Sequence, residues 1–364
     1  MILLYVFGAV TLINCAYYLL FAKFSFSKIS NKTQSEEQPV SLIVCAKNEA
    51  ENLQKHIPFW LNQTYSNYEI ILINDASVDD TLEVMEHYAE QDSRIQIVNV
   101  KNNEAFWGNK KYALTLGIKR AKNDRLVFTD ADCYPASEEW LSKMVANFSD
   151  KKQLILGYGA YERQPGFLNK LIRFETLMTA VQYFSYAQAG TPYMGVGRNL
   201  GYTSRLFYEK NGFMSHIKVV SGDDDLFVNE AATAKNTAIC VAPEAFTYSL
   251  PKEKREKWIH QKRRHYTTAK LYKPLHKFLL GLYYFANLLF WVLSGIILFT
   301  SLWMFGLGII LSRFLIQYII IGKAAGKLKE KDLIIFIPFF ELFLILTQLS
   351  IFISNRGEKS TQWK

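Results

Sequence analysis

The sequence predicts an α/β domain with a mostly parallel, Rossmann-like sheet, joined to one N-terminal and about three C-terminal membrane helices. Between residues 39 and 130, short apolar runs alternate with amphipathic stretches, and long apolar segments lie near both ends of the chain. Parallel strands that helices cover on both faces form continuous apolar runs. With 364 residues, the chain can hold one large domain and several membrane spans.

The alternating region supplies the elements of this sheet. Strands are expected at 40–46, 69–74, 95–100 and 125–129, and helices at 49–61, 79–90 and 110–121. Ser77 or Asp79 would cap the second helix. The sequence contains neither the G-x-G-x-x-G pattern nor a P-loop, which argues against a dinucleotide or P-loop site.

The first membrane segment opens the chain. Residues 1–22 carry no charge, and Lys23, Lys28 and Lys32 follow them. A cleavable signal peptide has the opposite order, so residues 1–24 are expected to be an uncleaved anchor that leads into a polar linker at 25–38. Its C-terminal end would face the cytoplasm.

Three further spans are expected within residues 278–354, before a tail at 355–364. The apolar block 278–322 is long enough for two helices with a turn near Thr300 and Ser301, and 333–353 is long enough for a third. The loop at 323–331 carries four lysines, which by the positive-inside rule face the cytoplasm. We therefore expect an integral protein of a bacterial inner membrane, with the domain at 39–250 in the cytoplasm.

Two charged residues interrupt the C-terminal spans. Arg313 and Glu341 lie inside apolar segments, where a charge usually faces a partner or a polar path. They would pair with each other, or Arg313 would meet an anionic lipid head group. A third alternative is that both snorkel to the membrane surface.

The formal net charge is +9, and the basic residues cluster beside apolar segments, which favours a membrane surface over nucleic acid as the partner. Residues 251–277 are basic and contain Trp258, Tyr266 and Tyr272, as expected for an amphipathic helix on a membrane; a solvated basic helix is the alternative. The four cysteines do not form close pairs, so neither a zinc site nor a disulfide framework is indicated.

Polar residues follow the predicted strands, at the sheet edge where ligands of such folds bind. Asp130 and Asp132 are two apart and can face the same side, where they would bind Mg²⁺ or Mn²⁺, although solvated turn residues show the same pattern. Asp75 would accept hydrogen bonds from a nucleoside, or belong to a turn and helix cap. Lys110 would meet a phosphate, or be an ordinary solvated lysine.

Together these residues resemble the family-2 glycosyltransferases, which have the GT-A fold. The resemblance covers roughly residues 39–270. The matching segments are 40–49, 70–80, 108–110, 128–132, 197–202, 211–213, 221–226 and 261–265. The segment 197–202 resembles the acceptor side of the family's site.

The resemblance implies roles for single residues. The metal, Mg²⁺ or Mn²⁺, would be bound by Asp130 and Asp132. Aligning on Leu226 places the general base at Asp223, with Asp224 as the close alternative, and puts Gly222 where the family has a glutamate. The donor-binding residues would be Ala46, Asn48, Glu49, Asp75, Lys110, Asp130, Gln261, Arg263 and Arg264.

The implied reaction is an inverting transfer of a sugar from a nucleotide diphosphate sugar, most often UDP-linked, to a lipid or lipid-linked hydroxyl. A processive polysaccharide synthase is an alternative, although His265 stands where such enzymes have a tryptophan. A non-enzymatic membrane scaffold that binds nucleotide-sugars is an alternative of another class.

Overall fold

The structure is a computed structural model that describes residues 1–29, 38–101 and 110–354. Within these residues, a seven-stranded sheet has the order β3-β2-β1-β4-β8-β6-β9. Its strands are β1 (Val40–Ala46), β2 (Tyr68–Asp75), β3 (Ile95–Val100), β4 (Arg125–Asp130), β6 (Leu154–Leu156), β8 (Leu200–Thr203) and β9 (Thr237–Ile239). Strands β1 to β4 are parallel, and β8 is antiparallel to both β4 and β6. The expected mostly parallel sheet is confirmed.

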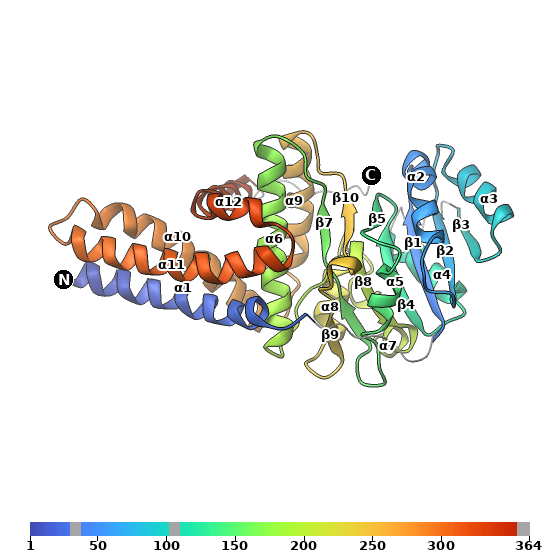
Figure 1. The fold of residues 1–364 in the computed structure, drawn as a ribbon, viewed down its shortest axis with the longest axis horizontal. Coiled ribbons are helices and arrows are strands. Elements are labelled where there is room, and N and C mark those ends of the chain that lie inside the picture. The colour runs from blue at the N-terminus through green and yellow to red at the C-terminus, as the bar shows by residue number, and fades with distance from the viewer. Residues whose placement is uncertain (30–37, 102–109, 355–364) are drawn as a thin grey trace.

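The predicted helices cover the two faces of the sheet (Figure 1). They are α2 (Ala50–Leu61), α3 (Thr81–Gln91) and α4 (Lys110–Arg120). Leu42 and Val44 of β1 belong to the core cluster that contains residues of α2, whereas Ile43 and Cys45 belong to the cluster that contains residues of α4. Successive side chains of a strand point to opposite faces, so an unbroken apolar run fills both layers.

A smaller sheet follows the end of β4. It consists of β5 (Cys133–Pro135), β10 (Thr247–Ser249) and β7 (Gly159–Tyr161), in the order β5-β10-β7. Helix α5 (Trp140–Val145) lies between β5 and β6 in the chain. The small sheet brings residues near 133, 160 and 248 together, although more than a hundred residues separate the first from the last.

Helix α6 (Phe167–Gln188) connects the domain to the membrane helices. It contacts α1 (Ile2–Phe26) and α12 (Ile337–Ser354), as well as β7 and β9. The ring of Phe184 stacks on Phe24 of α1 at 5.0 Å between centroids. One continuous core cluster therefore contains residues of α1, of α6 and of the large sheet.

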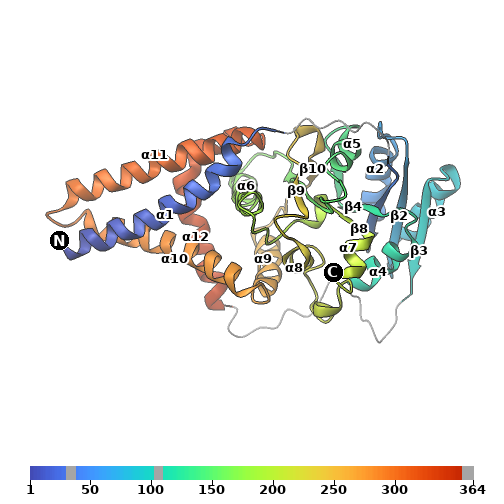
Figure 2. The ribbon, with the colours of Figure 1, turned by 90° about the horizontal axis from the view of Figure 1, so that it is seen from below.

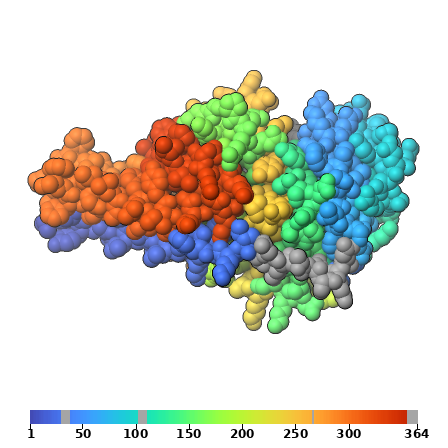
Figure 3. Space-filling model, in the orientation of Figure 1, coloured from blue at the N-terminus to red at the C-terminus, as the bar shows by residue number. Residues whose placement is uncertain are grey.

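The described residues include four helices that are long and apolar enough to cross a membrane. They are α1, α10 (Pro274–Ile297), α11 (Trp303–Lys327) and the segment Lys331–Ile353, which contains a 3-10 turn and most of α12. Helices α1, α10 and α11 lie side by side, and α12 crosses them at a steep angle (Figures 1 and 2). Figure 3 shows α12, in red, against the green surface of α6.

The two charges inside the membrane helices pair with each other. Arg313 Nη2 lies 2.8 Å from Glu341 Oε1, and the arginine side chain is completely buried. The same guanidinium donates hydrogen bonds to Asn287 at 2.8 Å, to Gln317 at 2.7 Å and to Asn14 at 3.4 Å. These five residues, from α1, α10, α11 and α12, form a polar clasp inside the bundle.

Helix α9 (Arg255–Ala269) occupies the basic segment before the membrane helices. Trp258 and nearby Tyr272 are buried in the protein, at 1% and 6% exposure. Lys262 pairs with Glu175 of α6 at 2.5 Å. Trp258 and Lys262 thus anchor the helix to the domain. Contact of the helix with a membrane surface stays a prediction.

Candidate active site

The carboxyl ends of β1, β2 and β4 lie together at one edge of the sheet. Strand register places Cys45 beside Asp130 and Ala46 beside Asn74. Ala46 and Asp75 are both buried there, at 1% and 4% exposure. The nucleoside-side residues expected from the sequence therefore come from adjacent strands.

The turns after β1 and β2 are joined by hydrogen bonds. Asn48 adopts a left-handed conformation with φ of 55°, and its side-chain oxygen accepts a hydrogen bond from the Val78 amide at 2.9 Å. The Glu49 amide donates to Thr81 Oγ1 at 2.8 Å. Asp79 accepts hydrogen bonds from the amides of Ala50 and Thr81, the first residues of α2 and α3. The N-cap of α3 is Asp80, which makes no side-chain cap hydrogen bond, so the prediction of a Ser77 or Asp79 cap was wrong.

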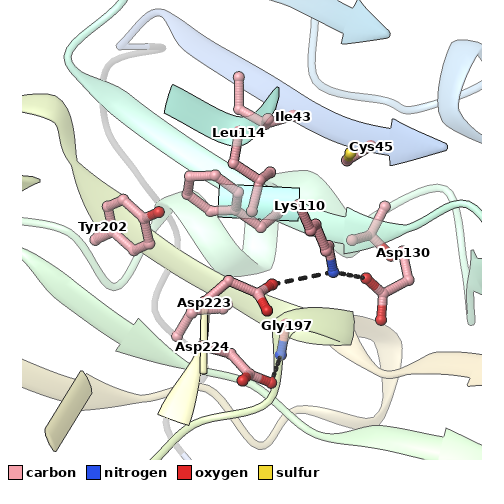
Figure 4. Close-up of a pocket in the computed structure, with 12 residues that line it drawn as sticks. Ile43, Cys45, Lys110, Leu114, Asp130, Gly197, Tyr202, Asp223 and Asp224 are labelled. Carbon is pink, nitrogen blue, oxygen red and sulfur yellow. Dashed lines mark hydrogen bonds and ion pairs between the residues drawn. The ribbon is translucent and has the colours of Figure 1, made fainter. Parts of the chain in front are cut away.

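Lys110 connects two acidic elements that lie far apart in the chain. Its Nζ lies 2.8 Å from Asp130 Oδ1 and 3.0 Å from Asp223 Oδ2 (Figure 4). Burial alone would lower the pKa of Lys110, but Asp130 and Asp223 raise it well above its ordinary value. Lys110 is therefore a charged bridge in this structure rather than a solvated lysine. Residues 108 and 109, part of the same predicted segment, lie outside the described residues.

Asp223 and Asp224 have opposite electrostatic surroundings. Burial would raise the pKa of Asp223, but the Lys110 ammonium lowers it below its ordinary value. Burial, together with the charges of Asp223 and Asp225, raises the pKa of Asp224 to about 7. The carboxylate of Asp224 accepts hydrogen bonds from the backbone amides of Gly197 at 2.8 Å and Asp225 at 2.7 Å.

A possible metal site lies just beyond β4. Ligand atoms of Asp130, Asp132 and Cys133 lie within 4.8 Å of one another. Burial and the neighbouring Asp132 raise the pKa of the Cys133 thiol well above its ordinary value, so the sulfur stays protonated. Two partly exposed carboxylates beside a neutral thiol suit a hard cation such as Mg²⁺ or Mn²⁺ better than a thiolate-bound metal.

These groups surround a pocket with an apolar inner wall (Figure 4). Its polar lining includes Lys110, Asp130, Asp223 and Asp224. The remaining lining residues are Ile43, Cys45, Leu114, Phe128, Thr129, Gly197, Leu200 and Tyr202.

The α9 residues that were predicted to bind the donor are not among the described residues that line the pocket. They are Gln261, Arg263 and Arg264. The segment is nevertheless tied to the acidic cluster, because Thr268 and Tyr272 donate hydrogen bonds to Asp225 at 2.5 and 2.7 Å. Asp225 is thus a structural link between α9 and the site that the sequence did not single out.

The segment that carries β1 to β8 is similar to a known protein family. Residues 41–208 match the model of Glycosyl transferase family 2. This segment is therefore a Glycosyl transferase family 2 domain. The match includes the ends of β1, β2 and β4 and the Asp-x-Asp pair, and it stops before Asp223 and α9.

Curated relatives match this chain over part of its length. An uncharacterized glycosyltransferase of Haemophilus influenzae is 36% identical over 122 residues, which cover 34% of this chain and 36% of the relative. A dolichyl N-acetyl-alpha-D-glucosaminyl phosphate 3-beta-D-2,3-diacetamido-2,3-dideoxy-beta-D-glucuronosyltransferase of Methanococcus voltae is 25% identical over 219 residues, or 58% of this chain and 60% of the relative. The chain thus spans less than two thirds of these relatives.

A solved structure has a similar fold. It is a mannosyltransferase from Pyrobaculum calidifontis in complex with GDP-Man and Mn²⁺, with a TM-score of 0.58 and 16% identity. The alignment covers 92% of this chain and 99% of that one. The GT-A fold expected from the sequence is confirmed.

One polar residue of the candidate site was recognised from the sequence only as part of a longer segment. Arg198 follows Gly197, the residue whose amide binds Asp224, and its own backbone carbonyl accepts a hydrogen bond from Thr129, beside Asp130. The segment 197–202 was recognised, but nothing in its spacing predicted that Gly197 binds Asp224 while Arg198 binds Thr129, the neighbour of Asp130.

Proposed function

We propose that this glycosyltransferase moves a sugar, with inversion, from a nucleotide diphosphate sugar to a hydroxyl of a lipid or lipid-linked acceptor. The observation that supports this most strongly is the bridge from Asp130 through Lys110 to Asp223. It joins the predicted donor side and the predicted base in one pocket, although 93 residues separate the two carboxylates in the chain. A UDP-linked donor is proposed because it is the commonest in the resembling family.

The donor would lie across the ends of β1, β2 and β4. Ala46, Asn48, Glu49 and Asp75 would contact its nucleoside side, with Lys110 and Asp130 toward the diphosphate. Asp130 and Asp132 would hold Mg²⁺ or Mn²⁺, and the metal would offset negative charge on the leaving diphosphate. The presence of GDP-Man and Mn²⁺ in the mannosyltransferase of similar fold supports this arrangement. From α9, Gln261, Arg263 and Arg264 would approach the diphosphate.

Asp223 would remove the proton from the acceptor hydroxyl. Its pKa is lowered by Lys110, so it is ionised at neutral pH and able to accept a proton. Asp224, which binds two backbone amides, would hold the acidic turn against Gly197. A base on the face opposite the leaving diphosphate gives inversion at the anomeric carbon.

The acceptor would come from the membrane side. Four apolar helices and the lipid-linked acceptor named for the Methanococcus voltae relative support this proposal. The lysine-rich segment at 323–331 supports a cytoplasmic position for the catalytic domain, in a bacterial inner membrane.

The deciding experiment incubates the purified full-length protein with labelled nucleotide-sugars and a membrane lipid extract. We expect one sugar on a lipid acceptor, and loss of transfer in Asp132→Asn and in Asp223→Asn. Glu139→Gln is the matched control, because its carboxylate lies on the surface and pairs with Lys143 of the same helix turn, away from the pocket lining. Near-normal turnover by either site variant would show that its assigned role is wrong.

The same assay separates the alternatives. A polymeric product would identify a processive synthase. Binding of nucleotide-sugar without transfer to any acceptor would favour the scaffold.

A further inference from the structure

Arg198 lies between the two acidic elements of the site. Its backbone carbonyl accepts hydrogen bonds from Thr129 Oγ1 at 3.1 Å and from Thr247 Oγ1 at 3.0 Å. Thr129 directly precedes Asp130, and Gly197 donates its amide to Asp224. Hydrogen bonds from the large sheet and the small sheet, and the bond between Gly197 and the acidic turn, therefore fix the position of the Arg198 backbone.

The side chain of Arg198 is held against the small sheet. Its guanidinium carbon lies 4.3 Å from the ring centre of Tyr161, and Nη1 donates hydrogen bonds to Ser249 Oγ at 3.1 Å and the Ala160 carbonyl at 3.4 Å. A Cβ added at Gly159 would lie 3.0 Å from Arg198 Cβ and 3.2 Å from its Nε. The glycine thus makes room for this side chain.

The positive charge of Arg198 has no contacting counter-ion. Among the described residues, no carboxylate oxygen lies within 4.0 Å of its guanidinium, whereas Lys110 has two such partners. Burial would lower the pKa of Arg198, but Tyr161, Cys133, Asp132 and Asp130 raise it, so the group stays charged. A half-buried charge without a contacting partner costs free energy that an anionic ligand would recover.

We propose that Arg198 binds a phosphate group of a substrate. Among the described residues, both hydrogen bonds from the guanidinium to the protein use Nη1, which leaves Nη2 for a phosphate oxygen. A guanidinium suits phosphate geometry. The phosphate belongs either to the donor diphosphate or to a lipid-linked acceptor. The inference rests on the proposed function, because it takes both substrates from it.

Two probes distinguish these sources. The purified full chain in detergent is titrated with Mn²⁺-pyrophosphate, which represents the donor side, and separately with farnesyl phosphate, with uncharged farnesol as its reference. Arg198→Met is expected to weaken binding of one phosphate probe about tenfold or more, because a charge-assisted bond is lost. A loss for pyrophosphate assigns Arg198 to the donor, and a loss for farnesyl phosphate assigns it to the acceptor.

Two milder variants test whether a loss of binding in Arg198→Met comes from misfolding. Arg198→Lys keeps the charge without the planar guanidinium and should retain part of the affinity. Gly159→Ala leaves Arg198 in the chain but crowds its side chain, and should weaken the same probe. Arg120→Met removes an exposed arginine at the end of α4 and serves as the control.

The proposal is overturned if folded Arg198 variants bind both probes like the wild type, or if the wild type binds neither. Its failure is distinct from failure of the proposed function. A wild type that transfers no sugar, combined with weakened phosphate binding in Arg198→Met, would reject the reaction and keep the binding site. A wild type that transfers sugar, combined with unchanged binding in the variants, would keep the proposed reaction and reject Arg198 as a phosphate-binding residue.

Discussion

At the scale of single residues, Asp223 and Asp224 are neighbours whose carboxyl groups differ because of what each one contacts. Asp223 faces the Lys110 ammonium, whereas Asp224 is buried between two other carboxylates. A base works only when it is deprotonated, so transfer is lost as the pH falls through the pKa of the base. With Asp223 as the base, kcat/KM should persist well below pH 7, because the pKa of Asp223 is lowered below its ordinary value.

The pH profile of kcat/KM, measured with one nucleotide-sugar, checks this prediction. A decline centred near pH 7 would instead assign the base to Asp224, whose pKa is about 7. Lys110→Met provides the internal comparison. Removing the ammonium should raise the pKa of Asp223, and so move the acid limb of the profile to higher pH.

At the scale of elements, the polar clasp makes the membrane helices depend on one another. Arg313→Leu would leave Glu341 buried without its ionic partner, and we expect a loss of about 3–5 kcal/mol in the free energy of unfolding. The measurement is denaturant unfolding in detergent. Ser312→Ala, one residue away and exposed, is the matched control. The double variant Arg313→Leu with Glu341→Leu should recover much of the loss, and no recovery would contradict the reason given.

The sequence predicted elements with regular patterning and missed the others. Strands β1, β2 and β4 are continuous apolar runs, so their positions followed from burial on both faces. Strands β5, β7 and β10 have three residues each, too few for any periodicity to be seen. Helix α6 is buried over most of its length, so it lacks the one-sided pattern of a surface helix.

The site residues, like the strands and helices, could be predicted only where a local sequence pattern marked them. The Asp-x-Asp pair could be placed because Asp130 ends a recognisable strand. The bridge from Lys110 to Asp223 and the position of Arg198 depend on how distant turns meet. Such contacts form only when the sheet order is complete, so local sequence patterns do not contain them.

At the scale of the whole molecule, the α/β domain and the membrane helices share one core. Residues of α1, α6 and the large sheet belong to the same cluster, and Phe24 stacks on Phe184. A fragment of residues 39–250 would expose the face of α6 that packs against α1 and α12. We expect this fragment to bind a dye for apolar surfaces and to aggregate, as measured by dye fluorescence and gel filtration. A monodisperse fragment that unfolds cooperatively would contradict this expectation.

The packing of α6 also bears on which acceptors can react. A domain joined to its anchor by a flexible linker would move to different distances from the membrane. In this protein α6 packs against the membrane helices, so the pocket would stay at one distance from the bilayer. In the proposed reaction, an acceptor would then be chosen by how far its hydroxyl projects from the bilayer, as well as by its chemistry. The length of the head group would then determine whether the acceptor hydroxyl reaches the pocket. Lipids with shorter or longer head groups would be poor substrates even with the same terminal sugar or alcohol.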